Sequence, residues 1–192
     1  GNGVYAYGAS NTFPTGTFQS TNYWVDVVFA PSNTLWTSLD SPEIDSNNDS
    51  QAITLGVKFT SSTTGVVRGV RFYKGSLNTG THAGSLWTAG GQLLATATFV
   101  DETPSGWQQV NFSTPVQITA GTVYVVSYHT TSGFYSLSRP YFVSSHVRGP
   151  LTALADGTNG GNGVYAYGAS DTFPTGTFQS TNYWVDVVLD YL

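Results

Sequence analysis

Aromatic, histidine and arginine side chains gather in one stretch of the sequence that could recognise a sugar. His82 and Trp87 stand at the two ends of the run HAGSLW, Asn78 lies just before it, and Arg71 and Tyr73 fall on the preceding predicted strand. Sugar-binding sites pack aromatic rings against the apolar face of the sugar and orient its hydroxyls with a few planar polar groups. This stretch therefore predicts a glycan-binding patch.

A second aromatic group surrounds the turn at 130–133, where His129 and Tyr135 have aromatic neighbours. The predicted ligand-binding residues are Arg71, Tyr73, Asn78, His82, Trp87, His129 and Tyr135. Two structural alternatives stay open, namely that Trp87 fills the core and that His82 only makes a hydrogen bond within a turn.

Acidic residues are concentrated in the run LDSPEIDSNNDS at 39–50. Calcium takes about six to eight oxygen ligands, which flexible Asp and Asn loops can supply. Asp45 and Asp49, with Asp186 of the last predicted strand, form a candidate calcium site. The spacing does not match an EF-hand, so the alternative is a solvated polar loop.

The sequence shows no constellation that is typical of an enzyme. The three histidines lack the spacing of metal-binding motifs, and neither a nucleophile elbow nor a phosphate-binding glycine loop is found. The absence of cysteine excludes thiolate zinc sites and cysteine nucleophiles. We therefore expect a non-catalytic protein whose one candidate cofactor is structural calcium, and an enzyme with paired carboxylates is the least favoured alternative.

The charge balance restricts the class of partner. Six Lys and Arg residues against eleven Asp and Glu residues give a net charge of −5, which argues against a nucleic-acid partner. No apolar run is long enough to cross a bilayer, so membrane insertion is not expected. The low charge, the many small polar residues and the lack of sulfur indicate an extracellular protein, either secreted or on a cell surface.

One segment of the sequence occurs twice. Residues 1–28 and 161–188 are identical except that Asn11 corresponds to Asp171. We interpret this as a tandem repeat, so that residues 1–29 end a preceding repeat and residues 30–192 form one complete β-sandwich repeat. One core has room for one copy of the strand YWVDVV. We therefore expect the first copy to lie elsewhere, or to be donated to or swapped with a neighbouring repeat.

Strand signals fill the complete repeat, and helix signals are nearly absent. Apolar side chains alternate through 52–60, which predicts a strand with one buried face. The further predicted strands are 65–74, 85–88, 92–100, 106–112, 122–129, 134–138, 164–167 and 183–189. Short strands separated by Gly, Asn and Pro turns predict an all-β fold, an antiparallel β-sandwich of the jelly-roll kind found in carbohydrate-binding modules.

The complete repeat contains, in order, the runs GVRFYKGSLNTGTHAGSLWTAGGQLLA at 69–95, ATFVDETPSGWQQV at 97–110, SYHTTSGFYS at 127–136, GPLTALADG at 149–157, and the closing GNGVYAYG and NYWVDVV. This succession resembles a bacterial extracellular family catalogued as domain of unknown function 4082. The resemblance implies β-sandwich modules that alternate with immunoglobulin-like or fibronectin-like repeats, or that are attached to secreted carbohydrate-active enzymes. It implies no activity.

Two functions remain in view at this point. The first is a non-catalytic extracellular repeat that binds a polysaccharide or cell-surface glycan, with tandem copies adding avidity to weak single sites. The second is a purely structural adhesin or filament repeat that associates with neighbouring repeats through its last strand.

Overall fold

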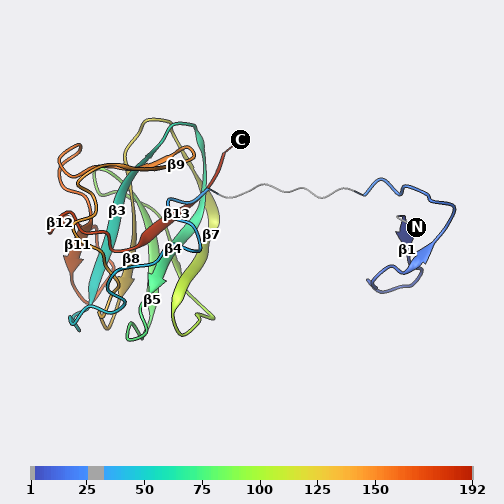
Figure 1. Ribbon diagram of the computed structural model, residues 1–192, viewed down its shortest axis with the longest axis horizontal. Helices are drawn as coiled ribbons and strands as arrows, with labels where there is room; N and C mark the ends of the chain where they lie inside the picture. Colours follow the sequence, from blue (N-terminus) through green and yellow to red (C-terminus); the bar gives the residue numbers. More distant parts are fainter. Residues whose placement is uncertain (1–2, 26–32, 192) are drawn as a thin grey trace. The chain divides into compact units, whose positions relative to one another are not determined.

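The computed structural model describes residues 3–25 and 33–191, and these residues form thirteen strands and no helix. The expected all-β class is therefore confirmed. The chain divides into two compact units, Gly1–Ala30 and Pro31–Leu192. Figure 1 colours both units along the chain. The tandem-repeat interpretation of this division stays a prediction.

The larger sheet of the second unit has the strand order β12-β11-β3-β8-β5-β6, with β10 paired to both β3 and β9. Its strands are β3 (Ile53–Ser61), β5 (His82–Thr88), β6 (Leu93–Thr98), β8 (Tyr124–Thr130), β9 (His146–Arg148), β10 (Leu151–Ala153), β11 (Val164–Tyr167) and β12 (Gly176–Thr177). Every pairing in this sheet is antiparallel.

The smaller sheet has the order β13-β4-β7 and is also antiparallel. Its strands are β4 (Gly65–Lys74), β7 (Gly106–Ile118) and β13 (Val185–Tyr191). The two sheets contribute to one buried core, where the Phe72 ring of β4 stacks on the Tyr128 ring of β8 with centroids 4.2 Å apart. This is the two-sheet packing of an antiparallel β-sandwich, and the finer jelly-roll assignment stays a prediction.

Alternation in the sequence predicted the central strands correctly. Ile53, Leu55, Val57 and Phe59 of β3 are all buried in the core. The strand predicted at 134–138 is wrong, because this segment makes only isolated bridges at Leu137 and Ser138. Its Tyr135 and Leu137 side chains are buried by loop packing, without the ladder of hydrogen bonds that a strand would have.

Residues 163–185, here called the closing segment, add the β11–β12 hairpin to the edge of β3. The register pairs Val164 with Gly56 and Tyr167 with Ile53. Gly163 makes the entry turn with a φ of +72°, and a Cβ atom there would lie 1.7 Å from the Thr181 carbonyl oxygen. Only glycine permits this turn, so the sequence fixes where the closing segment begins.

The first unit contains a small hairpin of β1 (Val4–Tyr5) and β2 (Gly16–Thr17). Val4 pairs with Thr17 as Val164 pairs with Thr177 in the second unit. Residues 3–25, here called the N-terminal copy, therefore fold locally like the closing segment.

Candidate functional site

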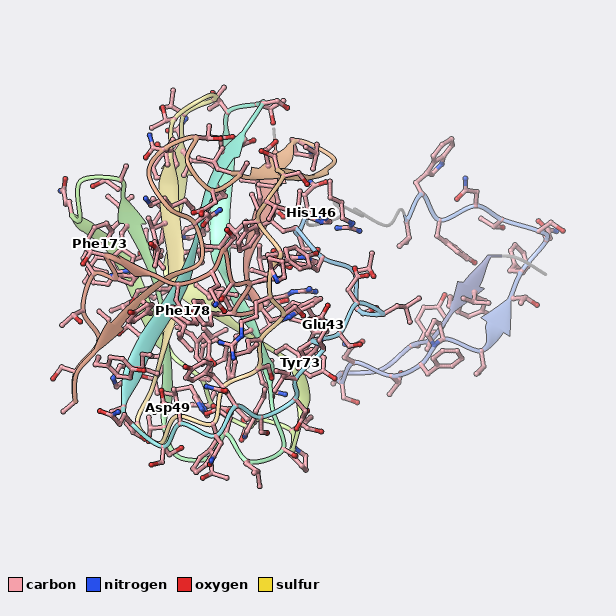
Figure 2. The ribbon with its side chains drawn as sticks, turned by 60° about the vertical axis from the view of Figure 1, so that its left-hand side comes forward. Glu43, Asp49, Tyr73, His146, Phe173 and Phe178 are labelled. Carbon is pink, nitrogen blue, oxygen red and sulfur yellow. The ribbon has the colours of Figure 1, made fainter. Side chains whose placement is uncertain are left out.

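A cleft of about 260 Å³ lies between the closing segment and the residues that β3 and two loops bring beside it. We call it the aromatic cleft. Its lining residues are Asn47, Asp49, Ile53, Tyr135, Arg139, Tyr165, Tyr167, Phe178 and Tyr183. Figure 2 labels Asp49 and Phe178, which contribute to it from two different parts of the chain. Five of the nine lining side chains are aromatic, so the cleft offers ring faces and edges to a ligand.

The floor of the cleft is rigid because its tyrosine rings pack on one another. Tyr135 and Tyr183 are buried and meet edge to face, with centroids 5.6 Å apart. Tyr165 packs edge to face on both Tyr183 and Tyr167, at 6.5 and 5.7 Å. The rings that remain accessible are Tyr167, which is 50% exposed, and Phe178, which is 47% exposed. A ligand would therefore meet these two rings first.

Asp49 fixes two of the tyrosine hydroxyls. The Tyr167 hydroxyl donates to Asp49 Oδ2 at 2.7 Å, and the Tyr135 hydroxyl donates to the same oxygen at 3.3 Å. Burial, with the Asp49 charge adding to it, raises the pKa of Tyr135 to about 12. The hydrogen bond to Asp49 also raises the pKa of Tyr167. Both hydroxyls thus keep their protons at neutral pH.

Gly133 allows the Asp49 loop to approach the Tyr135 segment. The Phe134 amide donates to the Asp49 carbonyl at 2.6 Å. A Cβ atom on Gly133, whose φ is +67°, would lie 2.2 Å from that carbonyl oxygen. The loop and Tyr135 can therefore meet only with glycine at this position.

Arg139 provides the positive charge of the cleft. Its guanidinium carbon lies 5.5 Å from the centre of the Phe178 ring, and the residue is exposed. The other five Lys and Arg side chains each contact a carboxylate or donate to a backbone carbonyl, whereas no hydrogen bond or ion pair joins Arg139 to another described residue. Its donors therefore remain available to a ligand.

The residues predicted around His82 form a buried network instead of a surface patch. His82 is fully buried, with Nδ1 2.8 Å from a Glu102 carboxylate oxygen and Nε2 2.9 Å from the side-chain amide of Asn78. Asn78 is also fully buried and contacts the Tyr128 hydroxyl at 3.2 Å. Burial lowers the pKa of His82, against the opposing effect of Glu102. A sugar cannot reach either side chain in this conformation.

Trp87 and His129 support the closing segment. Trp87 is buried against Val125 and Val164, and its indole nitrogen donates to Ser127 Oγ at 2.8 Å. His129 Nε2 lies 3.0 Å from the Gly168 carbonyl oxygen. Both side chains therefore hold the β11–β12 region in place. Trp87 fills the core, which is the structural alternative that the sequence left open.

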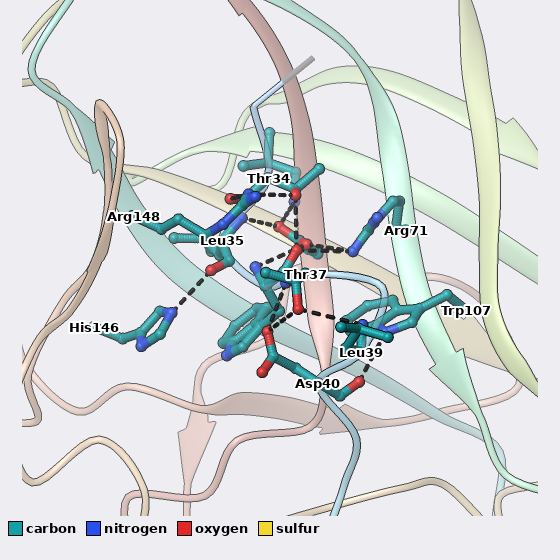
Figure 3. Close-up of polar contacts among 12 residues, drawn as sticks. Thr34, Leu35, Thr37, Leu39, Asp40, Arg71, Trp107, His146 and Arg148 are labelled. Atoms are coloured by element: carbon teal, nitrogen blue, oxygen red, sulfur yellow. Dashed lines mark hydrogen bonds and ion pairs between the residues drawn. The ribbon is translucent and has the colours of Figure 1, made fainter. Parts of the chain in front are cut away.

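Arg71 belongs to a buried ion pair on the smaller sheet. Its Nη2 donates to Asp186 Oδ2 at 3.0 Å and to the Trp36 carbonyl at 3.1 Å, and its guanidinium carbon lies 4.3 Å from the Trp107 ring centre. Asp186 also accepts from the Leu35 amide at 2.7 Å. Figure 3 shows Arg71, Leu35 and Trp107 around this point. Burial raises the pKa of Asp186 to about 6, although Arg71 and the backbone amides oppose the shift.

Tyr73 packs edge to face on Trp107 and Trp184, at 5.7 and 6.5 Å. The seven predicted ligand residues are thus distributed over several environments, and of these seven only Tyr135 lines the aromatic cleft.

The three predicted calcium ligands have separate protein partners. Asp45 accepts from the Ser76 amide and hydroxyl, Asp49 from the two tyrosine hydroxyls, and Asp186 from Arg71 and backbone amides. Within residues 3–25 and 33–191, no group of three or more His, Cys, Asp or Glu side chains is placed to hold a metal ion. Calcium binding stays a prediction, and the melting temperature of chelator-treated protein with and without added calcium tests it.

Sequence reasoning missed most of the cleft. Tyr165, Tyr167, Phe178 and Tyr183 all lie in the duplicated segment, and Arg139 lies in the loop that follows Ser138. The alternation in VYAY is a signal that could have placed its two tyrosines on one face of the predicted strand. That pattern could not show that Asp49 and Tyr135 would meet them there.

The comparisons with known proteins give one finding. The model of the family described as Domain of unknown function (DUF4082) matches residues 39–185. No curated protein and no solved structure matches. Among the residues described, none forms a helix long and apolar enough to cross a membrane.

Proposed function

Because the chain belongs to the DUF4082 family, whose description names no activity, we propose its function from the aromatic cleft: the protein is a non-catalytic module that binds a glycan there. One observation carries this proposal. The accessible rings of Tyr167 and Phe178 stand in a cleft that also contains the Arg139 guanidinium and the side chains of Asn47 and Asp49.

The aromatic rings and the polar groups of the cleft match the apolar face and the hydroxyl groups of a sugar. A pyranose has an apolar C–H face that packs on an aromatic ring, and a rim of hydroxyls that needs hydrogen bonds. Arg139 and the Asn47 amide supply donors. Asp49 supplies a remaining acceptor, because a carboxylate can accept about four hydrogen bonds and Asp49 accepts three within the protein, two from tyrosine hydroxyls and one from the Gln51 amide.

The size of the cleft limits what binds in it. About 260 Å³ is near the lower end of small-molecule sites, which span about 300 to 1,000 Å³. We therefore expect one sugar residue of a longer chain to occupy the cleft while its neighbours remain in solvent.

The non-catalytic part of the proposal follows from the carboxylates. Most glycoside hydrolases use a pair of carboxyl groups on either side of the bond that is cleaved. Of the described residues that line the cleft, Asp49 is the only one with a carboxylate, and it already accepts hydrogen bonds from two tyrosine hydroxyls.

We place this module in a bacterial protein that is secreted or displayed on the cell surface. The support is the low charge, the lack of cysteine and the duplicated segment of the sequence. Tandem copies would increase the avidity of a weak single site for a polysaccharide that carries many equivalent sugars.

Affinity electrophoresis in gels that contain neutral or acidic soluble polysaccharides tests the proposal. We expect at least one polysaccharide to retard the protein, and we expect Tyr167→Ala and Phe178→Ala to weaken that binding at least about tenfold, which corresponds to about 1.4 kcal/mol. Tyr167→Phe should retain most of the binding, because it keeps the ring and loses only the hydroxyl.

The N-terminal copy provides matched controls. Tyr7→Ala and Phe18→Ala are the same substitutions at the corresponding positions of residues 3–25 and should leave retardation unchanged. The proposal is wrong if no polysaccharide retards the protein, or if the two control variants reduce binding as much as the cleft variants do.

A further inference from the structure

The N-terminal copy and the closing segment have nearly the same sequence and opposite exposure. Val164 is fully buried, whereas its counterpart Val4 is 44% exposed, and Trp184 is 4% exposed, whereas its counterpart Trp24 is 89% exposed. Residues 3–25 and 163–185 differ in sequence only at Asn11 and Asp171. The N-terminal copy thus exposes the apolar face that the closing segment buries.

Both copies hold the same local conformation. Gln19, Ser20 and Trp24 have φ values of 45°, 53° and 52°, and their counterparts have 49°, 49° and 55°. The Trp24 amide donates to Asn22 Oδ1 at 2.8 Å, and the corresponding bond from Trp184 to Asn182 has the same length. The N-terminal copy therefore already has the backbone conformation that the docked segment has. Docking would need little rearrangement of its backbone, which lowers the entropic cost.

The structure also shows which surface this face fits. The closing segment binds the body, defined here as residues 33–160, along β3, where Val164 pairs with Gly56 and packs on Trp87 and Val125. Farther along the segment, Asn182 forms a bridge with Ser138 of the body. These contacts define the closing site of the body.

The one difference between the copies is compatible with this site. Asp171 accepts hydrogen bonds from Ser85 Oγ at 2.5 Å and Thr54 Oγ1 at 3.2 Å. Asparagine in the same place can accept from one hydroxyl through its oxygen and donate to the other through its nitrogen. It also avoids burying a charge, and burial raises the pKa of Asp171.

We infer that the N-terminal copy is a second closing segment, whose partner is the body of a second copy of this chain with its closing site open. The complex forms by strand addition to β3, the same mode that residues 163–185 use within one chain. Where residues 163–185 already occupy the closing site, their replacement by the N-terminal copy of another chain would gain no contacts. Binding therefore requires an acceptor whose closing site is open. This inference does not depend on glycan binding.

The experiment uses full-length chains as donor and acceptor. The acceptor carries Val4→Asp and Val164→Asp, which place a carboxylate where its own two segments would meet Trp87 and Val125. The donor is the wild-type chain, and the matched control donor carries Val4→Asp alone. Differently tagged chains are coexpressed, and the acceptor is purified by its tag.

We expect the wild-type donor to copurify with the acceptor and to increase its soluble yield at least fivefold, and light scattering should give the mass of a dimer. The Val4→Asp donor should do neither. An acceptor that fails to fold alone keeps the test valid, because the readout is its rescue by one donor and not by the other.

A second acceptor with Val4→Asp and Val164→Ala carries a milder change in its own closing segment. With this acceptor, the wild-type donor should raise the melting temperature, and the effect should increase with donor concentration. The inference is overturned if neither acceptor binds the wild-type donor, or if the Val4→Asp donor binds equally well.

Discussion

At the scale of single residues, the most consequential pair is Arg71 and Asp186. Asp186 is fully buried, and its partners are the Arg71 guanidinium and backbone amides of residues 35–36 and 187. A buried ion pair adds little stability compared with an apolar pair of the same shape, but removal of one partner leaves an uncompensated charge. The pair therefore acts as a constraint on how the segment at 33–37 packs on β13.

This pair gives a pH-dependent prediction. Because the pKa of Asp186 is raised to about 6 in the folded protein, its contribution to stability is present below its unfolded pKa and decreases as the pH rises through about 6. Arg71→Met should therefore lower the free energy of unfolding by about 3 to 5 kcal/mol at pH 8, and by clearly less at pH 5, where Asp186 is protonated. Urea unfolding at the two pH values measures the difference.

Arg68→Met is the control for that measurement. Arg68 pairs with Asp190, and its side chain is largely exposed, so its loss should cost less than about 1 kcal/mol and should not depend on pH between 5 and 8. Equal losses for Arg71→Met at pH 5 and pH 8 would contradict the assigned role of Asp186.

At the scale of elements, the closing segment and the N-terminal copy differ in burial although their sequences differ at one position only. The Trp184 ring lies 5.7 Å from the Trp36 ring and 5.9 Å from the Tyr141 ring, and its indole nitrogen donates to Ser138 Oγ at 3.0 Å. These contacts are tertiary, so the sequence of the segment alone does not determine its contribution to stability.

The matched pair Trp184→Ala and Trp24→Ala tests this point. Trp184→Ala should lower the free energy of unfolding by about 3 to 5 kcal/mol, because it leaves a cavity among packed rings. Trp24→Ala should change it by less than about 0.5 kcal/mol, as an exposed substitution does. Chemical denaturation followed by circular dichroism measures both, and similar losses for the two variants would show that the copies are not packed as described.

The same contrast shows how far the sequence could predict the structure. The alternation of Ile53, Leu55, Val57 and Phe59 predicted β3, because the face that packs in the core imposes a period of two. The expectation of a single buried face was wrong, since Thr54 on the other face is also fully buried, where it contacts Asp171 of the closing segment. The aromatic cleft could not be predicted in this way, since Tyr167, Asp49 and Tyr135 meet only through the pairing of β11 with β3 and the turn at Gly133. His82 was predicted to contact a ligand, whereas it is buried beside Glu102, which lies in a different loop, and the alternation of side chains does not show that the two residues meet.

At the scale of the whole molecule, the core of the second unit is self-sufficient. Every side chain of its main hydrophobic cluster lies between Leu35 and Leu189. None of the described residues of the first unit, residues 3–25, is a member of this cluster. Removal of the first unit should therefore leave this cluster intact.

Deletion of residues 1–30 should leave the unfolding free energy of the remainder unchanged within about 0.5 kcal/mol. Differential scanning calorimetry at one protein concentration compares the shortened chain with the full chain. A decrease of several degrees in the melting temperature would mean that the first unit stabilises the second, contrary to this expectation.

The aromatic cleft is assembled from two parts of the chain that can in principle separate. Tyr165, Tyr167, Phe178 and Tyr183 come from the closing segment, whereas Asp49 and Arg139 come from the body. A ligand that needs both parts binds only when they are joined, and by thermodynamic linkage it must hold them together. Such a ligand would thus act as a non-covalent crosslink, so that force applied to the last strand would be resisted more strongly while the ligand is bound.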